Sequence, residues 1–240
     1  MKKLLLAILF YSSFYFSQIS IGIKINDGDK NNLKDVKNLQ IKIKNNSDKS
    51  YAIPIDISEF KAFYLDEYCN DYSLPENYQD LKFKICVEDL KDNQVLTAFP
   101  KFKLSGLIDE KDHKVIAEMK RRERLIQIQN KEISDWSNKN KINQKNDWIL
   151  KNKSLYTNFI FLKPKEEIVY NKRINLGEFN VDKISGNYEY YDLDDSKYKL
   201  SLKYCIDNKV YDYLTIEQKI KLKKFNLFAG KIESNKIDLN

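Results

Sequence analysis

The chain has 240 residues, and its 42 Lys and Arg residues outnumber its 35 Asp and Glu residues, which gives a formal charge of +7. Hydrophobic residues make up 42% of the chain and aromatic residues 13%, which is enough for a packed core and excludes a wholly disordered chain. One His and three Cys exclude most His-based metal sites and His-dependent catalytic triads. The sequence therefore indicates no catalytic residues, no metal site and no cofactor.

The N-terminus has the pattern of a secretory signal peptide. A basic start at residues 1–3 precedes an apolar run over residues 4–16, and a small residue follows that run. The run is shorter than the roughly 20 residues that span a membrane. We expect a signal peptide at residues 1–18, one domain at residues 19–240, no transmembrane span after cleavage, and a periplasmic or extracellular location. An uncleaved anchor that continues to Ile23 is the competing interpretation.

Short segments that alternate apolar and polar residues predict strands over most of the remaining chain. The alternation is clearest in two segments, where it places Leu81, Phe83, Ile85 and Val87, and separately Leu200, Leu202, Tyr204 and Ile206, on one face. The predicted strands cover residues 19–25, 39–44, 51–57, 60–64, 81–88, 94–99, 155–162, 167–174, 197–206, 209–214 and 232–239. This pattern predicts a mainly β protein, an antiparallel sandwich or barrel.

Three cysteines in an exported chain permit one disulfide and leave one thiol over. Alternation places Cys86 and Cys205 on the polar faces of two predicted strands, so the two can pair if those strands are neighbours. Cys69 lies in a polar loop from which it can reach either of them. The alternative interpretation, that all three cysteines are free thiols without a role, has the same weight as a disulfide.

The segment at residues 193–202 resembles the tyrosine corner of immunoglobulin-like sandwiches, in which a Tyr that opens a strand bonds back to upstream backbone. Tyr198 holds that position here. The turn at residues 162–166 and the segment at residues 228–235 resemble the approaches to a middle strand and to a closing strand. No Trp lies in these flanks, so the buried Trp of antibody domains is missing. The resemblance is to bacterial Ig-like and fibronectin type III sandwiches, and it implies an antiparallel Ig-like β-sandwich.

Strand alternation stops between residues 109 and 153, where the sequence contains neither Gly nor Pro. Positions that step by four and three residues predict a helix of about 25 residues from near Glu110, followed by a short helix around residues 144–151. These positions are Val115, Met119, Arg122, Ile126, Gln129, Ile133 and Trp136. The segment contains 12 basic and 8 acidic residues and both Trp residues. We expect a long α-helical insertion that carries most of the excess charge.

Two interpretations of this insertion remain open. In the first, a helical hairpin packs on the sandwich, with its Trp residues as anchors and its charges solvated. In the second, a protruding arm binds a partner through Arg and Trp, which are residue types enriched at interface hot spots. The candidate binding residues are Arg121, Arg122, Arg124, Trp136 and Trp148.

The sequence favours an exported, non-enzymatic interaction module whose partner is a protein. Nucleic acid is a disfavoured partner because the chain has only four Arg residues, and Arg provides the bidentate contacts to phosphates and bases. An inhibitor of an exported hydrolase is one alternative, by analogy with sandwiches that present loops to clefts. A carboxylate-based hydrolase is a second alternative and would require two acids that converge across a cleft. The sequence does not indicate the oligomeric state.

Overall fold

The computed structural model describes residues 18–26, 35–64, 81–102 and 113–239, and this part of the chain is mainly β. The strands of the first half are β1 (Ile19–Ile25), β2 (Val36–Asn45), β3 (Tyr51–Pro54), β4 (Asp56–Ala62), β5 (Lys82–Asp89), β6 (Gln94–Val95) and β7 (Phe99–Lys101). The strands of the second half are β8 (Phe159–Leu162), β9 (Glu167–Asn175), β10 (Tyr188–Tyr190), β11 (Tyr198–Ile206), β12 (Asn226–Leu227), β13 (Gly230–Glu233) and β14 (Ile237–Asp238).

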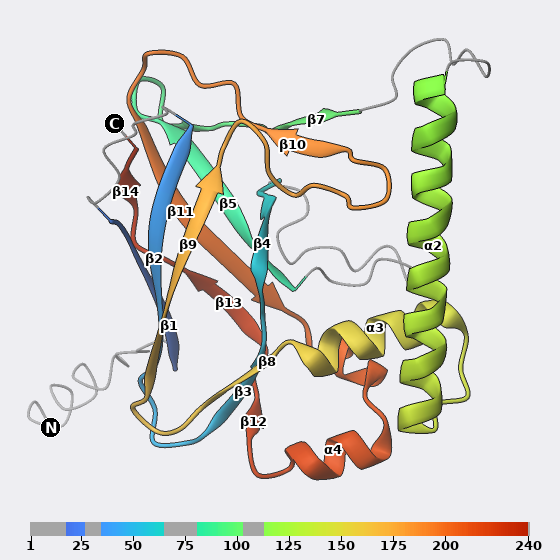
Figure 1. Cartoon of the computed structure of the whole chain (residues 1–240). Coiled ribbons are helices and arrows are strands. Elements are labelled where there is room, and N and C mark those ends of the chain that lie inside the picture. Colours follow the sequence, from blue (N-terminus) through green and yellow to red (C-terminus); the bar gives the residue numbers. More distant parts are fainter. Residues whose placement is uncertain (1–17, 27–34, 65–80, 103–112, 240) are drawn as a thin grey trace, which may run out of the picture.

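Two larger sheets and two small ones organise these strands (Figure 1). One large sheet has the order β1–β2–β9 and is antiparallel throughout. The other has the order β13–β11–β5–β4, with β14 also paired to β11 and β6 to β5. The small sheets are β12–β3–β8 and β10–β7. Most pairs are antiparallel, as predicted, but β4 runs parallel to β5 and β12 runs parallel to β3.

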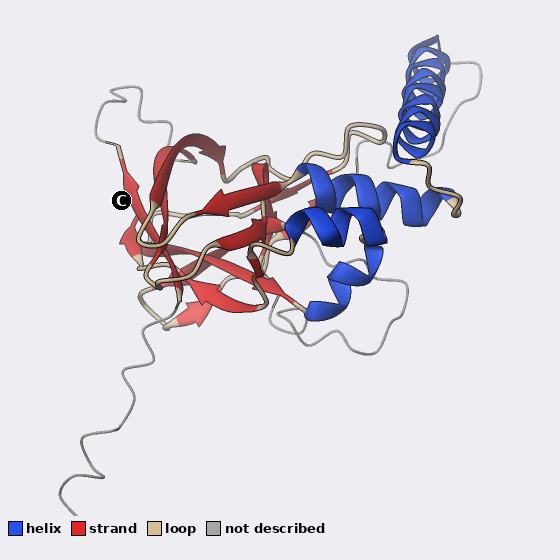
Figure 2. Ribbon diagram, turned by 90° about the horizontal axis from the view of Figure 1, so that it is seen from below, coloured by secondary structure: helices blue, strands red, loops and turns tan. Residues whose placement is uncertain are grey.

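The helices gather on one side of the sheets (Figure 2). They are α2 (His113–Asn140), α3 (Asn146–Thr157), the 3-10 helix η3 (Asn208–Tyr213) and α4 (Ile216–Leu222). Helix α2 stands farthest from the strands, whereas α3 and α4 lie next to them. In the part of the chain that the structure describes, no helix combines the length and the apolar character needed to cross a membrane.

Two features predicted from the sequence fall largely outside the described residues. The expected signal peptide at residues 1–18 is represented only by Gln18, whose backbone carbonyl accepts a hydrogen bond from the backbone N–H of Asn46 at 2.8 Å. The predicted helix start near Glu110 is also outside them, and the described helix begins at His113.

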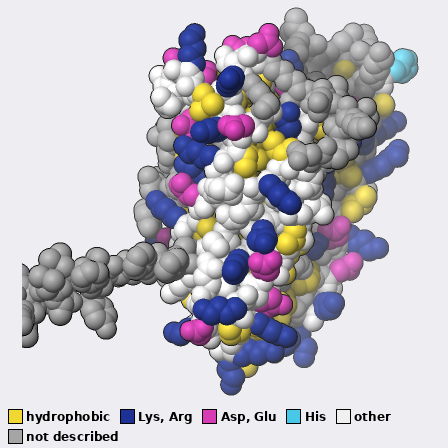
Figure 3. All heavy atoms as spheres, turned by 90° about the vertical axis from the view of Figure 1, so that its left-hand side faces the viewer, with side chains coloured by type: hydrophobic (Ala, Val, Ile, Leu, Met, Phe, Trp, Pro, Cys, Tyr) yellow, Lys and Arg dark blue, Asp and Glu magenta, His cyan; other side chains and the backbone are white. Residues whose placement is uncertain are grey.

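Charged side chains of both signs are interspersed over the face shown in Figure 3. Lys and Arg side chains crowd around a few hydrophobic ones at the lower end of that face. The basic residues are therefore not confined to the predicted insertion.

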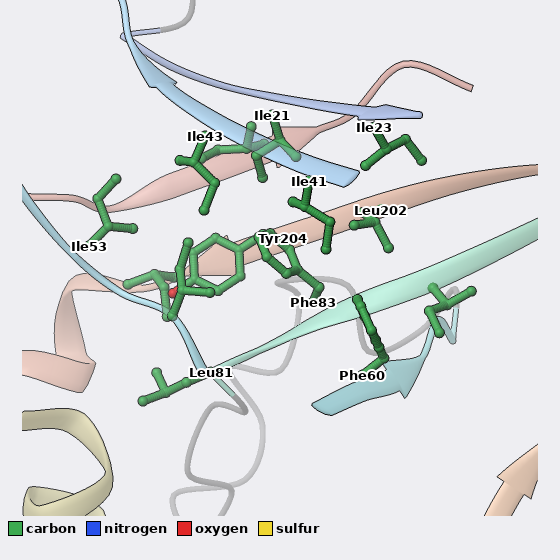
Figure 4. Close-up of a cluster of buried hydrophobic side chains, with 14 of the residues drawn as sticks. Ile21, Ile23, Ile41, Ile43, Ile53, Phe60, Leu81, Phe83, Leu202 and Tyr204 are labelled. Carbon is green, nitrogen blue, oxygen red and sulfur yellow. The ribbon is translucent and has the colours of Figure 1, made fainter. Parts of the chain in front are cut away.

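The core lies between the two larger sheets (Figure 4). Isoleucines of β1 and β2, among them Ile21 and Ile41, face Phe83 of β5 and Tyr204 of β11. The rings of Phe83 and Tyr204 meet edge to face at a centroid distance of 5.7 Å, and the Tyr204 hydroxyl donates to the backbone carbonyl of Pro54. Burying a polar hydroxyl requires such a partner, so this bond fixes how β3 approaches β11.

The alternation in β5 and β11 is confirmed. All eight side chains predicted to share the two apolar faces are buried: Leu81, Phe83, Ile85, Val87, Leu200, Leu202, Tyr204 and Ile206. The two strands pair antiparallel over Lys84–Asp89 and Tyr198–Lys203, with Ile85 opposite Leu202. These strands place two continuous rows of apolar side chains in the core.

The predicted strand at residues 209–214 is wrong. The segment forms η3, because the Asp207 side chain accepts a hydrogen bond from the backbone N–H of Lys209 at 2.8 Å and turns the chain there. Helix α4 follows directly, and Thr215 and Gln218 form a capping box at its start. Residues 155–157, also predicted as strand, belong to the end of α3. In residues 207–218, the capping hydrogen bonds of Asp207, Thr215 and Gln218 determine the local structure, and the alternation of apolar and polar residues does not.

The contact expected of a tyrosine corner is present. Tyr198 opens β11, its hydroxyl donates to Asp194 Oδ1, and it accepts a hydrogen bond from the Asp194 backbone N–H at 3.3 Å. This contact holds the chain at its entry into β11. It is a local feature, and the Ig-like class stays a prediction.

Candidate interaction surface on helix α2

Helix α2 is attached near its N-terminal end by a cluster of three charged side chains. Glu118 holds Arg121 in a bidentate pair, with Arg121 Nε 2.8 Å from Oε2 and Nη2 2.7 Å from Oε1, and Arg122 Nε lies 3.2 Å from the same Oε1. The two guanidinium groups then donate to backbone carbonyls of the loop between β9 and β10. The acceptors are the carbonyls of Lys183, Ile184 and Ser185, at 3.0, 2.9 and 2.7 Å.

The loop is folded to present these three carbonyls. Asp182 Oδ1 accepts hydrogen bonds from the backbone N–H groups of Ile184 and Ser185, and Gly186 closes the turn with a φ of 72°. Such a positive φ is unstrained only for a residue without Cβ. Carbonyls of consecutive residues thus converge on α2, where Arg can satisfy several acceptors at once.

Electrostatics strengthen this attachment. The hydrogen bond from Arg121, together with that from Arg122 and their positive charges, lowers the pKa of Glu118 from 4.5 to about 2. The pKa of Asp182 is also lowered, chiefly because the backbone N–H of Ser185 donates to its carboxylate. Both groups are therefore ionised in neutral solution, and both hold the loop and the helix in the observed arrangement.

The C-terminal half of α2 is attached to α3. Ile133 is buried with Ile142 and Ile149, and the two Trp residues pack against this cluster. Trp136 Nε1 donates to Asn152 Oδ1 at 2.8 Å, and the Trp136 ring lies 6.3 Å from that of Tyr156. Trp148 packs on Tyr213, with a centroid distance of 6.1 Å. Both Trp side chains therefore act as internal anchors, as the packed-hairpin interpretation expects.

Asn152 is the centre of a buried polar junction that the sequence analysis missed. It is fully buried, and besides Trp136 it contacts Gln218 and the Tyr213 carbonyl, to which its Nδ2 donates at 2.6 and 2.5 Å. The junction joins α2, α3, η3 and α4. The only signal in the sequence was the Thr215–Gln218 capping-box spacing, which predicts the start of α4 but not what Gln218 contacts.

The predicted stripe of α2 divides into an attached part and an exposed part. Arg122, Ile133 and Trp136 face the loop or α3, whereas Met119 is 57% exposed and Ile126 is also exposed. Ile128, outside that stripe, and Arg124 are exposed as well. Of the five candidate binding residues, the structure places Arg121, Arg122, Trp136 and Trp148 in contacts within the chain, and only Arg124 on the exposed surface.

The proposed pairing of Cys86 with Cys205 is wrong. Cys86 is a free thiol, and Cys205 forms a disulfide. Cys86 lies opposite Ser201, so Cys205 is four residues farther along β11, at about 13 Å, whereas a disulfide needs Cα atoms within about 7 Å. The third cysteine, Cys69, lies outside the described residues.

Cys86 and Cys205, which were predicted on the polar faces of their strands, are both buried. The outer face of the β5–β11 pair is covered: Lys203 Nζ lies 4.2 Å from the centre of the Phe63 ring, and Tyr191 donates to the Ile85 carbonyl at 2.8 Å. Burial raises the pKa of the Cys86 thiol. A neutral, enclosed thiol has little nucleophilic character.

No grouping of three or more His, Cys, Asp or Glu side chains suited to hold a metal ion occurs among the described residues. No protein-family model, curated protein or solved structure matches this chain. The site therefore has to be interpreted from its own geometry.

Proposed function

We propose that the protein is an exported interaction module that contacts a protein partner through the exposed side chains of α2. The proposal includes an Ig-like β-sandwich as the body and α2 with α3 as its helical insertion. The observation that carries it is the placement of α2, which stands away from the sheets (Figures 1 and 2) and still exposes Met119, Ile126 and Ile128.

The attachment of α2 at two points supports this proposal. A helix held by the Glu118–Arg121–Arg122 cluster at one end and by Trp136 at the other presents its exposed side in a fixed orientation. Fixing the orientation before binding lowers the entropic cost of association. Arg121, Arg122, Trp136 and Trp148 then act as positioning residues, and Arg124 and the exposed apolar residues act as contacts.

The test is photo-crosslinking in cells that export the protein. A photoreactive amino acid replaces Met119 or Ile126, which share one face of α2, and Val169, an exposed residue of β9, is the matched control. We expect the α2 positions to yield a common protein adduct that the Val169 position does not. No adduct from α2, or the same adducts from Val169, would contradict the proposal.

Point substitutions are preferable to removing the whole predicted insertion. Deletion of residues 109–153 would remove Asn152 and leave the buried Gln218 without this partner. The substitutions Met119→Asp and Ile126→Asp change only exposed side chains. We expect Met119→Asp to abolish the adduct formed from position 126, and Ile126→Asp to abolish the adduct formed from position 119, without changing thermal stability.

Export has its own test. Residues 1–18 fused to a reporter enzyme that is active only after export should give activity, and replacing Lys2 and Lys3 with Glu should reduce it, because the basic start orients a signal peptide. Activity that stays in the cytoplasm would show that the chain is not exported. The interaction proposal for α2 would then have to be tested with cytoplasmic partners.

A further inference from the structure

The short helix α4 carries apolar side chains on the face that points away from the protein. Gln218 and Leu222 are buried, whereas Ile216 is 79% exposed and Ile220 is 57% exposed. Successive helical residues are rotated by about 100°, so the two isoleucines project together on the side opposite the buried pair. This arrangement is the reverse of an ordinary surface helix, whose apolar face points toward the core.

Lysines lie within α4, directly after it, and in neighbouring turns. We use the term α4 surface for Ile216, Ile220, Phe161 and the exposed lysines Lys49, Lys163, Lys165, Lys219, Lys221, Lys223 and Lys224. Glu217 is the only acidic residue within α4. Helix α4 and the turns that precede β3 and β9 lie at the lower end of the molecule in Figure 1.

Hydrogen bonds hold the parts of the α4 surface together. The backbone N–H and the side chain of Asn226, just after α4, both donate to the Ser50 carbonyl, at 2.9 and 3.1 Å. Lys165 Nζ donates to the Asn46 carbonyl at 2.7 Å and pairs with Asp48 at 3.1 Å. The turn between β2 and β3 therefore lies against both the segment after α4 and the turn between β8 and β9.

Aromatic residues extend the apolar part of this surface. The exposed ring of Phe161 in β8 lies 4.7 Å from the ring of Phe225, which directly follows the last lysine of the α4 segment. Lys224 Nζ lies 5.2 Å from the centre of the Phe225 ring. Apolar and cationic groups thus alternate on one surface.

We propose that the α4 surface docks onto a membrane whose surface carries anionic lipid. The isoleucines project from a convex helix, and the boundary between head groups and acyl chains accepts such side chains without a preformed groove. Lysine stems remain in contact with the apolar layer while their ammonium groups reach the phosphates. Each lysine near an anionic surface contributes about fivefold in affinity. This proposal does not depend on the role of α2.

The test is co-sedimentation of the purified mature chain with vesicles. We expect binding to phosphatidylglycerol-containing vesicles, weakening with added salt, and much weaker binding to pure phosphatidylcholine. The double variant Ile216→Ser/Ile220→Ser should bind about tenfold more weakly or worse, because the inserting apolar area is lost. The control Ile128→Ser, an exposed isoleucine of α2, should bind like the unmodified chain.

Charge is tested with two matched sets of substitutions. Replacing Lys219, Lys221, Lys223 and Lys224 with Gln should reduce binding about a hundredfold or more. Replacing Lys120, Lys131, Lys139 and Lys145, which are exposed outside this surface, should have a much smaller effect. If both sets of substitutions reduce vesicle binding equally, the proposal is overturned, because the binding would then reflect general attraction between a basic protein and anionic lipid.

Two other outcomes would also overturn it. If the folded chain binds no vesicles, the membrane is not the partner, and an acidic protein would be the better candidate for the lysines. If the serine double variant binds as well as the unmodified chain, the isoleucines do not insert. Circular dichroism of every variant separates loss of binding from loss of folding.

Discussion

At the scale of single residues, we expect a large loss of stability from a substitution at Asn152. Asn152→Leu removes the acceptor for Trp136 Nε1 and the donor to Gln218 and to the Tyr213 carbonyl, so three polar groups of the junction lose this partner. We expect a loss of about 3 kcal/mol in the free energy of unfolding. Urea denaturation followed by circular dichroism measures it.

The control for that prediction is Asn143→Leu, at an exposed position between α2 and α3. It should change the free energy of unfolding by no more than about 0.5 kcal/mol. Similar values for the two variants would show that the junction around Asn152 contributes nothing particular to stability.

The cysteines give a second prediction at this scale. Without reductant, iodoacetamide should leave Cys86 of the folded chain unmodified, because Cys86 is buried and its thiol pKa is raised by burial. In urea it should modify Cys86 but not Cys205, since Cys205 is held in a disulfide. Peptide mass spectrometry identifies the modified residue. Modification of Cys205 in unreduced protein would contradict the assignment.

At the scale of elements, the attachment of α2 should weaken at low pH. The pKa of Glu118 is about 2 in the folded protein against an ordinary 4.5. A lowered pKa means that the carboxylate stabilises the fold fully above its ordinary pKa and loses that effect as the pH falls toward the folded value. The contacts of Arg121 and Arg122 with Glu118 should therefore weaken between about pH 4.5 and pH 2.

Glu118→Gln isolates this effect from the other titrating groups. The variant should unfold at a lower temperature than the unmodified chain near about pH 6, and the difference should vanish as the pH approaches about 2. The pKa of Asp182 is also lowered, but Asp182 is present in both proteins, so its effect on the difference in melting temperature cancels. A difference in melting temperature that stays constant over this range would show that the Glu118 charge does not hold the helix.

The elements also show how far sequence reasoning can go. The faces of β5 and β11 could be predicted because a strand repeats every two residues and the core selects one side. The contacts of Arg121 and Arg122 could not, since their acceptors are backbone carbonyls of residues 183–185, which leave no trace in residue type. The outward face of α4 was missed because a helix of seven residues is too short to show periodicity.

At the scale of the whole molecule, α3 belongs to the body and α2 is peripheral. Leu155 of α3 is fully buried in the main core, whereas the buried cluster around Ile133 of α2 is separate from that core. The predicted insertion is therefore not one structural unit. Among the residues that the structure describes, its first helix contacts the loop between β9 and β10 and helix α3, and its second helix closes the core.

This division predicts that α2 can be removed without unfolding the body. Replacing residues 113–140 with a flexible linker should keep a cooperative urea transition, because the core around Leu155 is untouched and the loss of the Ile133 and Trp136 contacts is confined to the outer side of α3. Leu155→Ala, by contrast, should cost about 2–5 kcal/mol, because it leaves a cavity in the main core. If the linker variant loses its cooperative transition while Leu155→Ala retains near-normal stability, α2 is the part that the fold depends on. The α2 positions could then no longer be tested separately from the body.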